Sequence, residues 1–200
     1  MSDSLTYRSL VSVPVVACWD PVPAAVTDLI DQAQRIWDQR SADETRLVSL
    51  VNSNYYIAFH AIKQQIQELN RPGLRLVELG SGCGVVANIA ALLGVESSGI
   101  EIEPGLCELS NQLATACKLS TKFIPCSYRD WEGGQTSEMS AAARKGLSAL
   151  READLIYGYP WPSEQTYLAS VVKQHCKHGA RYLTYHGGSR LQLRRVSVAI

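Results

Sequence analysis

The sequence predicts an α/β protein built on a mainly parallel, doubly wound sheet with an N-terminal helical cap. From residue 73 onward, short apolar runs alternate with longer runs of helical periodicity, the pattern of strands joined by crossover helices. The first apolar run, residues 74–79, leads into glycines at every second position and then into an apolar helical run, residues 85–93. A turn without side chains at the start of a helix lets a ligand lie directly on the backbone N–H groups.

Composition limits the class of protein. The chain has 200 residues, enough for one domain with a sizeable core. Lys plus Arg and Asp plus Glu number 19 each, so no net charge attracts nucleic acid or an anionic membrane. The six cysteines form no C-x-x-C pair, and no apolar run reaches the ~20 residues of a membrane span. We therefore expect a cytoplasmic protein without metal, membrane or strong nucleic-acid binding.

Two short segments leave alternatives open. Residues 10–17 are apolar and precede Cys18, as at a lipoprotein cleavage site, but the run is short and its leader has one basic residue. Residues 175–178, His-Cys-Lys-His, follow a predicted helix without a second half of a metal site, which favours surface residues over ligands.

Residues 1–72 are predicted to form the cap and residues 73–200 the sheet domain. Residues 1–19 are irregular or strand-like, one helix begins at Asp20-Pro21, and a second runs from near Asp43 to a break at residues 70–73. Four side chains of the second helix are candidates to face a pocket, with ordinary packing as the alternative for each: Asn54, Tyr55, Tyr56 and His60.

The alternating part of the chain contains six predicted strands and four predicted helices. The strands are residues 74–79, 95–101, 122–126, 154–158, 180–185 and 191–198. The helices are residues 84–93, a run from Pro104 to about residue 117, residues 137–152 and residues 163–176.

The glycine turn distinguishes between two classes of ligand. A dinucleotide fingerprint needs a small residue where this chain has Val85, and Glu78 would repel a pyrophosphate but attract a cationic ligand. The segment Glu-x-Gly-x-Gly-x-Gly after a strand resembles the first motif of the class I S-adenosylmethionine (SAM)-dependent methyltransferases. The resemblance implies SAM as the cofactor, with these residues at its site: Glu78, Gly80, Ser81, Gly82 and Gly84.

Two further segments follow predicted strands. Glu101 ends the second strand, where an acid accepts hydrogen bonds from the ribose hydroxyls of an adenosine, and Ile102 can pack on the adenine. In the family, the loop after the third strand often supplies a polar group to the adenine. Ser127, Tyr128 and Asp130 are the candidates, and Asp130 as a turn cap is the alternative.

Residues 154–162, which end in Tyr-Gly-Tyr-Pro-Trp-Pro, lie at the end of the fourth strand and indicate the acceptor side. They resemble the Asn/Asp-Pro-Pro-aromatic motif of amino-methylating members, but Tyr159 replaces the amide or acid and Trp161 replaces the second proline. This departure disfavours a base amine or glutamine amide as acceptor. It favours a flat or apolar acceptor, or a cation on ring faces. Packing against the N-terminal helices is the alternative for both aromatics.

The resemblance implies methyl transfer from SAM to a small-molecule acceptor, with no catalytic base assigned; His60, His186, Tyr159 and Asp130 each could serve. A catalytically degenerate binding protein and an aminopropyl transferase are the alternatives. The family sheet usually ends in two further strands, the last antiparallel, and here only about fifteen residues follow the fifth strand. We therefore expect a sheet trimmed at its C-terminal end or completed by a partner.

Overall fold

The computed structural model describes residues 7–15, 20–41, 52–131 and 139–199. Its elements, in chain order, are β1 (Tyr7–Val13), α1 (Ala24–Ser41), α2 (Tyr55–Leu69), β2 (Arg75–Leu79), α3 (Val85–Leu92), β3 (Glu96–Glu101), α4 (Pro104–Ala116), β4 (Lys122–Pro125), the 3₁₀ turn η1 (Tyr128–Trp131), α5 (Ala141–Glu152), β5 (Leu155–Gly158), α6 (Gln165–His175), β6 (Arg181–Tyr185) and β7 (Leu191–Ala199). From β2 to β7, most boundaries lie within a few residues of those predicted.

The strands form one sheet with the order β1-β7-β6-β5-β2-β3-β4. The five strands β2 to β6 run parallel to one another, and β7 is antiparallel to both of its neighbours. The predicted doubly wound α/β fold is therefore confirmed. The strand order reverses at β2, which lies between β3 and β5, and ligands of such sheets bind at this switch point.

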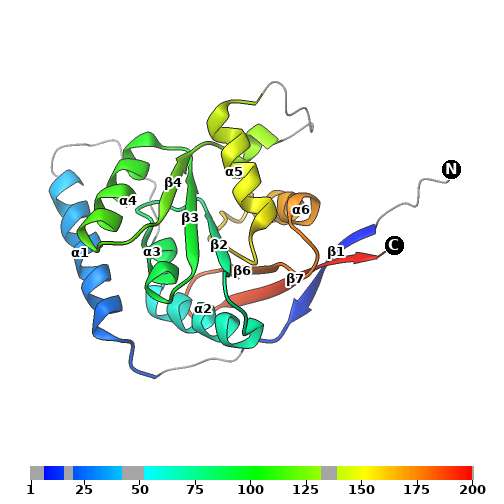
Figure 1. Cartoon of the computed structure of the whole chain (residues 1–200), viewed down its shortest axis with the longest axis horizontal. Helices are drawn as coiled ribbons and strands as arrows, with labels where there is room; N and C mark the ends of the chain where they lie inside the picture. Colours follow the sequence, from blue (N-terminus) through cyan, green and yellow to red (C-terminus); the bar gives the residue numbers. More distant parts are fainter. Residues whose placement is uncertain (1–6, 16–19, 42–51, 132–138, 200) are drawn as a thin grey trace.

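The edge of the sheet differs from the prediction. The N-terminal strand β1 pairs along its length with the C-terminal strand β7, for example Leu10 with Val196, so the first and last strands lie side by side at one edge (Figure 1). The expectation of a trimmed sheet or a partner strand is wrong, because β1 supplies the outer strand. It also follows that residues assigned to the cap contribute a strand to the sheet.

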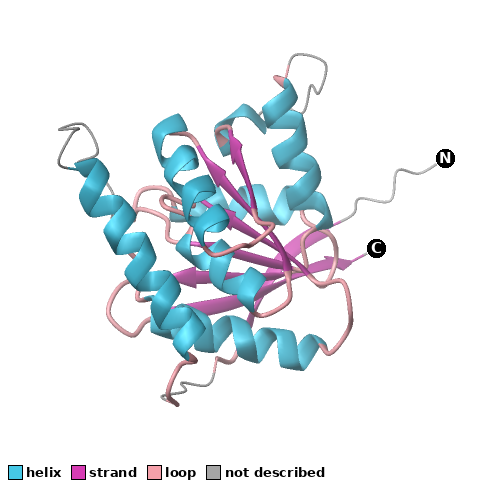
Figure 2. Ribbon diagram, turned by 60° about the vertical axis from the view of Figure 1, so that its left-hand side comes forward, coloured by secondary structure: helices cyan, strands magenta, loops and turns pink. Residues whose placement is uncertain are grey.

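Helices cover both faces of the sheet (Figure 2). One face packs on α5 and α6, and the other packs on α2, α3 and α4, with α1 lying against α3 and α4. The helix expected to begin near Asp43 begins instead at Tyr55, because the Asn54 side chain accepts the N–H of Ile57 at 3.2 Å and caps it. Residues 42–51 lie outside the described residues.

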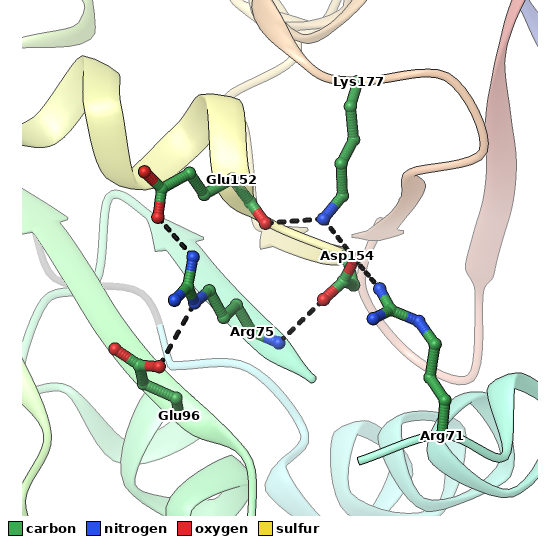
Figure 3. A network of polar contacts seen from close by, with 6 residues as sticks. All are labelled: Arg71, Arg75, Glu96, Glu152, Asp154 and Lys177. Atoms are coloured by element: carbon green, nitrogen blue, oxygen red, sulfur yellow. Dashed lines mark hydrogen bonds and ion pairs between the residues drawn. The ribbon is translucent and has the colours of Figure 1, made fainter. Parts of the chain in front are cut away.

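A charged cluster joins four segments at the N-terminal edge of the parallel strands (Figure 3). The buried carboxylate of Asp154 accepts the backbone N–H of Arg75 at 3.0 Å and pairs with Arg71 and Lys177. The Arg75 side chain pairs with Glu152 and, at 3.2 Å, with Glu96. This cluster fixes the start of β2 against the start of β5, and the opposite ends of these strands carry the candidate site.

Candidate functional site

A cleft of about 1140 Å³ opens at the C-terminal ends of β2, β3 and β5. Ten of the twelve residues proposed from the sequence for the cofactor and acceptor sites line it: Glu78, Gly80, Ser81, Gly82, Glu101, Ile102, Ser127, Tyr128, Tyr159 and Trp161. Gly84 and Asp130 are not among the lining residues. The structure thus brings together residues spread over more than eighty positions of the sequence at the switch point of the sheet.

The glycine turn is fixed by bonds to the end of β3. The N–H groups of Gly80 and Ser81 donate to the Ile100 carbonyl at 2.9 and 3.0 Å. Gly80 and Gly82 both have positive φ, 70° and 52°. A Cβ built on Gly80 would meet no atom within 4 Å, so the backbone here faces open space in which a ligand can lie.

Gly84 and Ser81 have packing roles that the sequence pattern did not reveal. A Cβ on Gly84 would lie 2.4 Å from the Phe123 ring of β4 and 2.8 Å from Ser110 of α4. Gly84 therefore permits close packing of the turn, rather than access of a ligand. The Ser81 hydroxyl lies against β3, where a Cβ on Gly99 would be 2.6 Å from it.

Glu101 is bonded to the glycine turn as well as exposed to the cleft. One carboxylate oxygen accepts the N–H of Gly82 at 2.8 Å, and the other accepts the N–H of Glu103 at 3.0 Å. Each carboxylate oxygen has a second lone pair, so both can still accept from a ligand. Glu101 therefore stabilises the glycine turn and is also placed to bind a ligand that lies over the turn.

Glu78 is a second buried acid in the same cleft. Its carboxylate accepts the N–H of Ala87, in the first turn of α3, at 2.8 Å. Burial, and then the charge of Glu101, raise the pKa of Glu78 to about 8, although the bond from Ala87 opposes this shift. The carboxyl is therefore largely neutral at pH 7 without a ligand, and the expected repulsion of a pyrophosphate applies only at higher pH. A cationic ligand would favour the ionised form.

The acceptor side of the cleft is aromatic. Tyr159 packs edge to face on Tyr185, with ring centroids 4.8 Å apart, and also lines the cleft. Trp161 is 52% exposed and Ile102 is 62% exposed, each at the cleft. Trp161 belongs to none of the hydrophobic clusters of the core, whereas Tyr159 packs on one side against the cluster that includes α2.

The loop after β4 is divided between the cleft and the core. Ser127 and Tyr128 line the cleft, and burial and the neighbouring Glu164 raise the pKa of the Tyr128 hydroxyl. Asp130 instead accepts the N–H of Ser127 at 3.2 Å and caps η1. Trp131 is buried and donates its ring N–H to the Ala143 carbonyl at 3.0 Å.

Of the four candidates near the start of α2, only Tyr55 lines the cleft. Asn54 caps the helix, Tyr56 is exposed, and His60 packs edge to face on Phe59. Sequence reasoning missed several lining residues: Asn52, Ser53, Arg129, Glu164 and Gln165. Ser53 accepts the Tyr157 hydroxyl at 2.9 Å, a contact between distant segments that no local pattern signals.

Other expectations concern metals and membranes. Cys176 is buried, and burial raises its thiol pKa to about 12, so the surface assignment was wrong for this residue. His178 Nδ1 accepts the N–H of Val198 at 3.1 Å. Over residues 7–15, 20–41, 52–131 and 139–199 there is no group of three potential metal ligands. In that part of the chain, no helix has the length and apolar character to cross a membrane. Cys18 lies outside it.

Comparisons with known proteins identify the fold. No family model matches the sequence, and no curated protein matches it. Similar solved structures include an RNA methyltransferase from Salinibacter ruber in complex with S-adenosylhomocysteine, with TM-score 0.50, 14% identity, and coverage of 74% of this chain and 93% of that one. A hypothetical protein from Thermus thermophilus has TM-score 0.53, 11% identity, and coverage of 77% and 90%. A putative caffeoyl-CoA O-methyltransferase from Staphylococcus aureus has TM-score 0.50, 16% identity, and coverage of 81% and 73%. The chain therefore has the class I SAM-dependent methyltransferase fold.

Proposed function

We propose that this protein binds SAM in the cleft and transfers its methyl group to a small-molecule acceptor. The observation that carries the proposal is the convergence of Glu78, the turn of residues 80–84 and Glu101 on one cleft at the switch point of the sheet. The bound S-adenosylhomocysteine of the Salinibacter ruber enzyme, which shares the fold, supports the same ligand class.

The residues of the cleft fit this cofactor. Glu101 retains lone pairs for the hydroxyls of a ribose, and the open space over Gly80 admits a ligand against the backbone. Glu78 is buried beside a second acid, and its raised pKa reports the cost of that burial. The ammonium and sulfonium of SAM are cations that would relieve it.

The chemistry follows from positioning. SAM supplies a methyl group on a positively charged sulfur that is already a good leaving group. The chain then has to align the acceptor with that methyl and exclude water, and no base is needed for an acceptor that is already nucleophilic. Tyr159 and Trp161 present aromatic surface for a flat, apolar or cationic acceptor at the end of β5.

A small-molecule acceptor is favoured over nucleic acid by charge. The chain is neutral overall, and the described lining of the cleft includes four acids, Glu78, Glu101, Glu103 and Glu164, but one arginine, Arg129. Phosphate backbones bind surfaces rich in Lys and Arg. The structural similarity to an RNA methyltransferase therefore reflects the shared fold.

Calorimetric titration of the purified protein tests the proposal. SAM and S-adenosylhomocysteine should bind and NAD should not; binding of NAD alone would sink the methyltransferase assignment. Incubation with methyl-labelled SAM and a small-molecule extract then separates an enzyme from a degenerate binding protein, because only an enzyme releases S-adenosylhomocysteine in step with labelled product.

A further inference from the structure

A second cavity, of about 420 Å³, lies beside the cleft between α6 and the outer strands. One wall is a single face of α6, with Thr166, Ala169, Ser170 and Lys173 at helical spacing. The floor comes from β1 and β7, through Leu10, Gln192 and Arg194. We call this cavity the α6 groove.

The topology explains why the α6 groove is open. β6 and β7 are joined by a hairpin, closed by the N–H of His186 donating to the Arg190 carbonyl at 2.9 Å. No crossover helix follows β6 in the part of the chain that the structure describes. Among the described elements, the face of β7 and β1 next to α6 therefore has no second helix over it.

The α6 groove is positively charged. Its lining includes two cationic side chains, Lys173 and Arg194, and, over the described residues, contains neither Asp nor Glu. Burial, and then the positive charges of Arg194 and Arg190, lower the pKa of His186. The cavity is thus suited to a negatively charged group.

Arg194 has no carboxylate partner among the described residues, unlike four other arginines of the chain. Arg71, Arg75, Arg129 and Arg181 each pair with a carboxylate. Arg194 instead stacks on the Tyr182 ring, 4.9 Å from its centroid. Its buried Nε makes no hydrogen bond to any residue that the structure describes. No carboxylate among the described residues therefore offsets the charge of this guanidinium, and an anion in the α6 groove would do so.

The α6 groove and the cleft are adjacent. Pro160, Gln165 and His186 line both cavities. His186 is held in place by its Nε2, 2.8 Å from the Thr184 hydroxyl oxygen. One molecule that occupies both cavities would have to extend across the border that these shared residues form.

We propose that the α6 groove binds the anionic group, a phosphate or a carboxylate, of the methyl acceptor, with Arg194 and Lys173 as its charged ligands. The guanidinium edge of Arg194 matches the planar array of oxygens in either group. Thr166, Ser170 and Gln192 supply further hydrogen bonds. This inference rests on the proposed function and narrows its substrate to a small molecule with one anionic end and one end that reaches the aromatic side of the cleft.

Anion titrations of the protein saturated with S-adenosylhomocysteine test the inference. Inorganic phosphate and acetate are the probes, and calorimetry measures each affinity for wild type, Arg194→Gln and Lys173→Gln. The favoured anion should bind wild type, and each variant should weaken it about tenfold or more. The comparison of phosphate with acetate identifies which anionic group the site prefers.

Arg195→Gln is the matched control. Arg195 is the next residue of β7, so its side chain projects from the opposite face of the sheet, and it carries the same charge. It should leave anion affinity unchanged. Arg194→Gln loses the packing of Arg194 on Tyr182 and could fail to fold for that reason. Lys173 is exposed on α6, so the Lys173→Gln variant should fold in either case.

Three results would overturn the inference. They are no binding of either anion at millimolar concentration, an equal loss in Arg195→Gln, and displacement of the anion by a short single-stranded RNA whose binding depends on Arg194. The last would assign the groove to a nucleic-acid backbone. If wild type does not bind S-adenosylhomocysteine but binds phosphate in an Arg194-dependent way, the proposed function is refuted and the α6 groove remains an anion site.

Discussion

Glu101→Gln should weaken both the folded state and the binding of the cofactor, for separate reasons. In the structure the two carboxylate oxygens each accept a backbone N–H, from Gly82 and from Glu103. A glutamine amide has one oxygen, so in either orientation its NH₂ faces one of these N–H groups. Leaving one buried donor unsatisfied costs about 1–3 kcal/mol, and we expect the free energy of unfolding to fall by that amount.

This loss of stability could not be predicted from the sequence, which shows neither of these two hydrogen bonds. The loss of affinity is a second effect. If the carboxylate accepts the ribose hydroxyls, removing its charge should cost about 1.5–3 kcal/mol, or roughly a 10- to 150-fold rise in the Kd for S-adenosylhomocysteine. Urea unfolding of the ligand-free protein measures the first effect, and calorimetry of the folded variant measures the second.

A ligand pair separates direct contact from distortion of the turn. Wild type should bind adenosine more tightly than 2′,3′-dideoxyadenosine, which lacks the two ribose hydroxyls. Glu101→Gln should discriminate little between the two ligands, because it lacks the carboxylate that accepts from those hydroxyls. Glu96→Gln, at the exposed opposite end of β3, should change neither stability nor affinity by much, since its pair with Arg75 is a surface ion pair. If Glu101→Gln lowers stability but leaves S-adenosylhomocysteine affinity intact, Glu101 only stabilises the glycine turn, and the adenosine site is misplaced.

Three further predictions concern the same cleft. Gly82→Val should abolish cofactor binding and also lower the melting temperature, because φ of 52° is strained for a β-branched residue; unchanged affinity in calorimetry would remove the turn from the site. Glu78 has its pKa raised from 4.5 to about 8 in the folded protein, so its contribution to stability is complete below about pH 4.5 and is lost as the pH rises through 8. Urea unfolding at several pH values should show this decline in wild type, and Glu78→Gln should flatten it; equal slopes would refute the assignment. Trp161→Ala should slow acceptor turnover while sparing the melting temperature and S-adenosylhomocysteine affinity, since the side chain is half exposed; a core residue would cost ~3–5 kcal/mol instead.

The parallel part of the fold was predictable because its signals are local. Strands β2, β4, β5 and β6 are short, mostly apolar runs bounded by Gly, Pro or charged residues, and each helix between the parallel strands has its own apolar stripe. The more polar β3 is marked instead by its place between two such helices. The candidate site was predictable for a related reason. In a parallel sheet the C-terminal ends of all strands meet at one edge, so residues that follow different strands converge without knowledge of any long-range contact. Glu101, Ser127 and Tyr159 were found in this way.

What the sequence did not reveal depends on contacts between distant segments. Nothing in residues 7–13 specifies that they pair with the last strand, because β-sequence patterns define faces rather than neighbours. The glycine pattern likewise could not distinguish Gly80, which faces open space, from Gly84, which packs against Phe123. The start of α2 was misplaced because the helical periodicity continued N-terminally past its cap, Asn54.

The unusual edge of the sheet and the α6 groove have one structural origin. A strand added in parallel beside β6 would need a crossover of a dozen or more residues, which usually forms a helix on the sheet. Here β7 follows β6 by a hairpin, and the next place is filled by β1, which arrives from the other end of the chain. Two strands are therefore added to the sheet without a helix between them in the described chain. Their uncovered face is the floor of the α6 groove, where Arg194, paired in register with Ser12 of β1, meets no acid among the described lining residues.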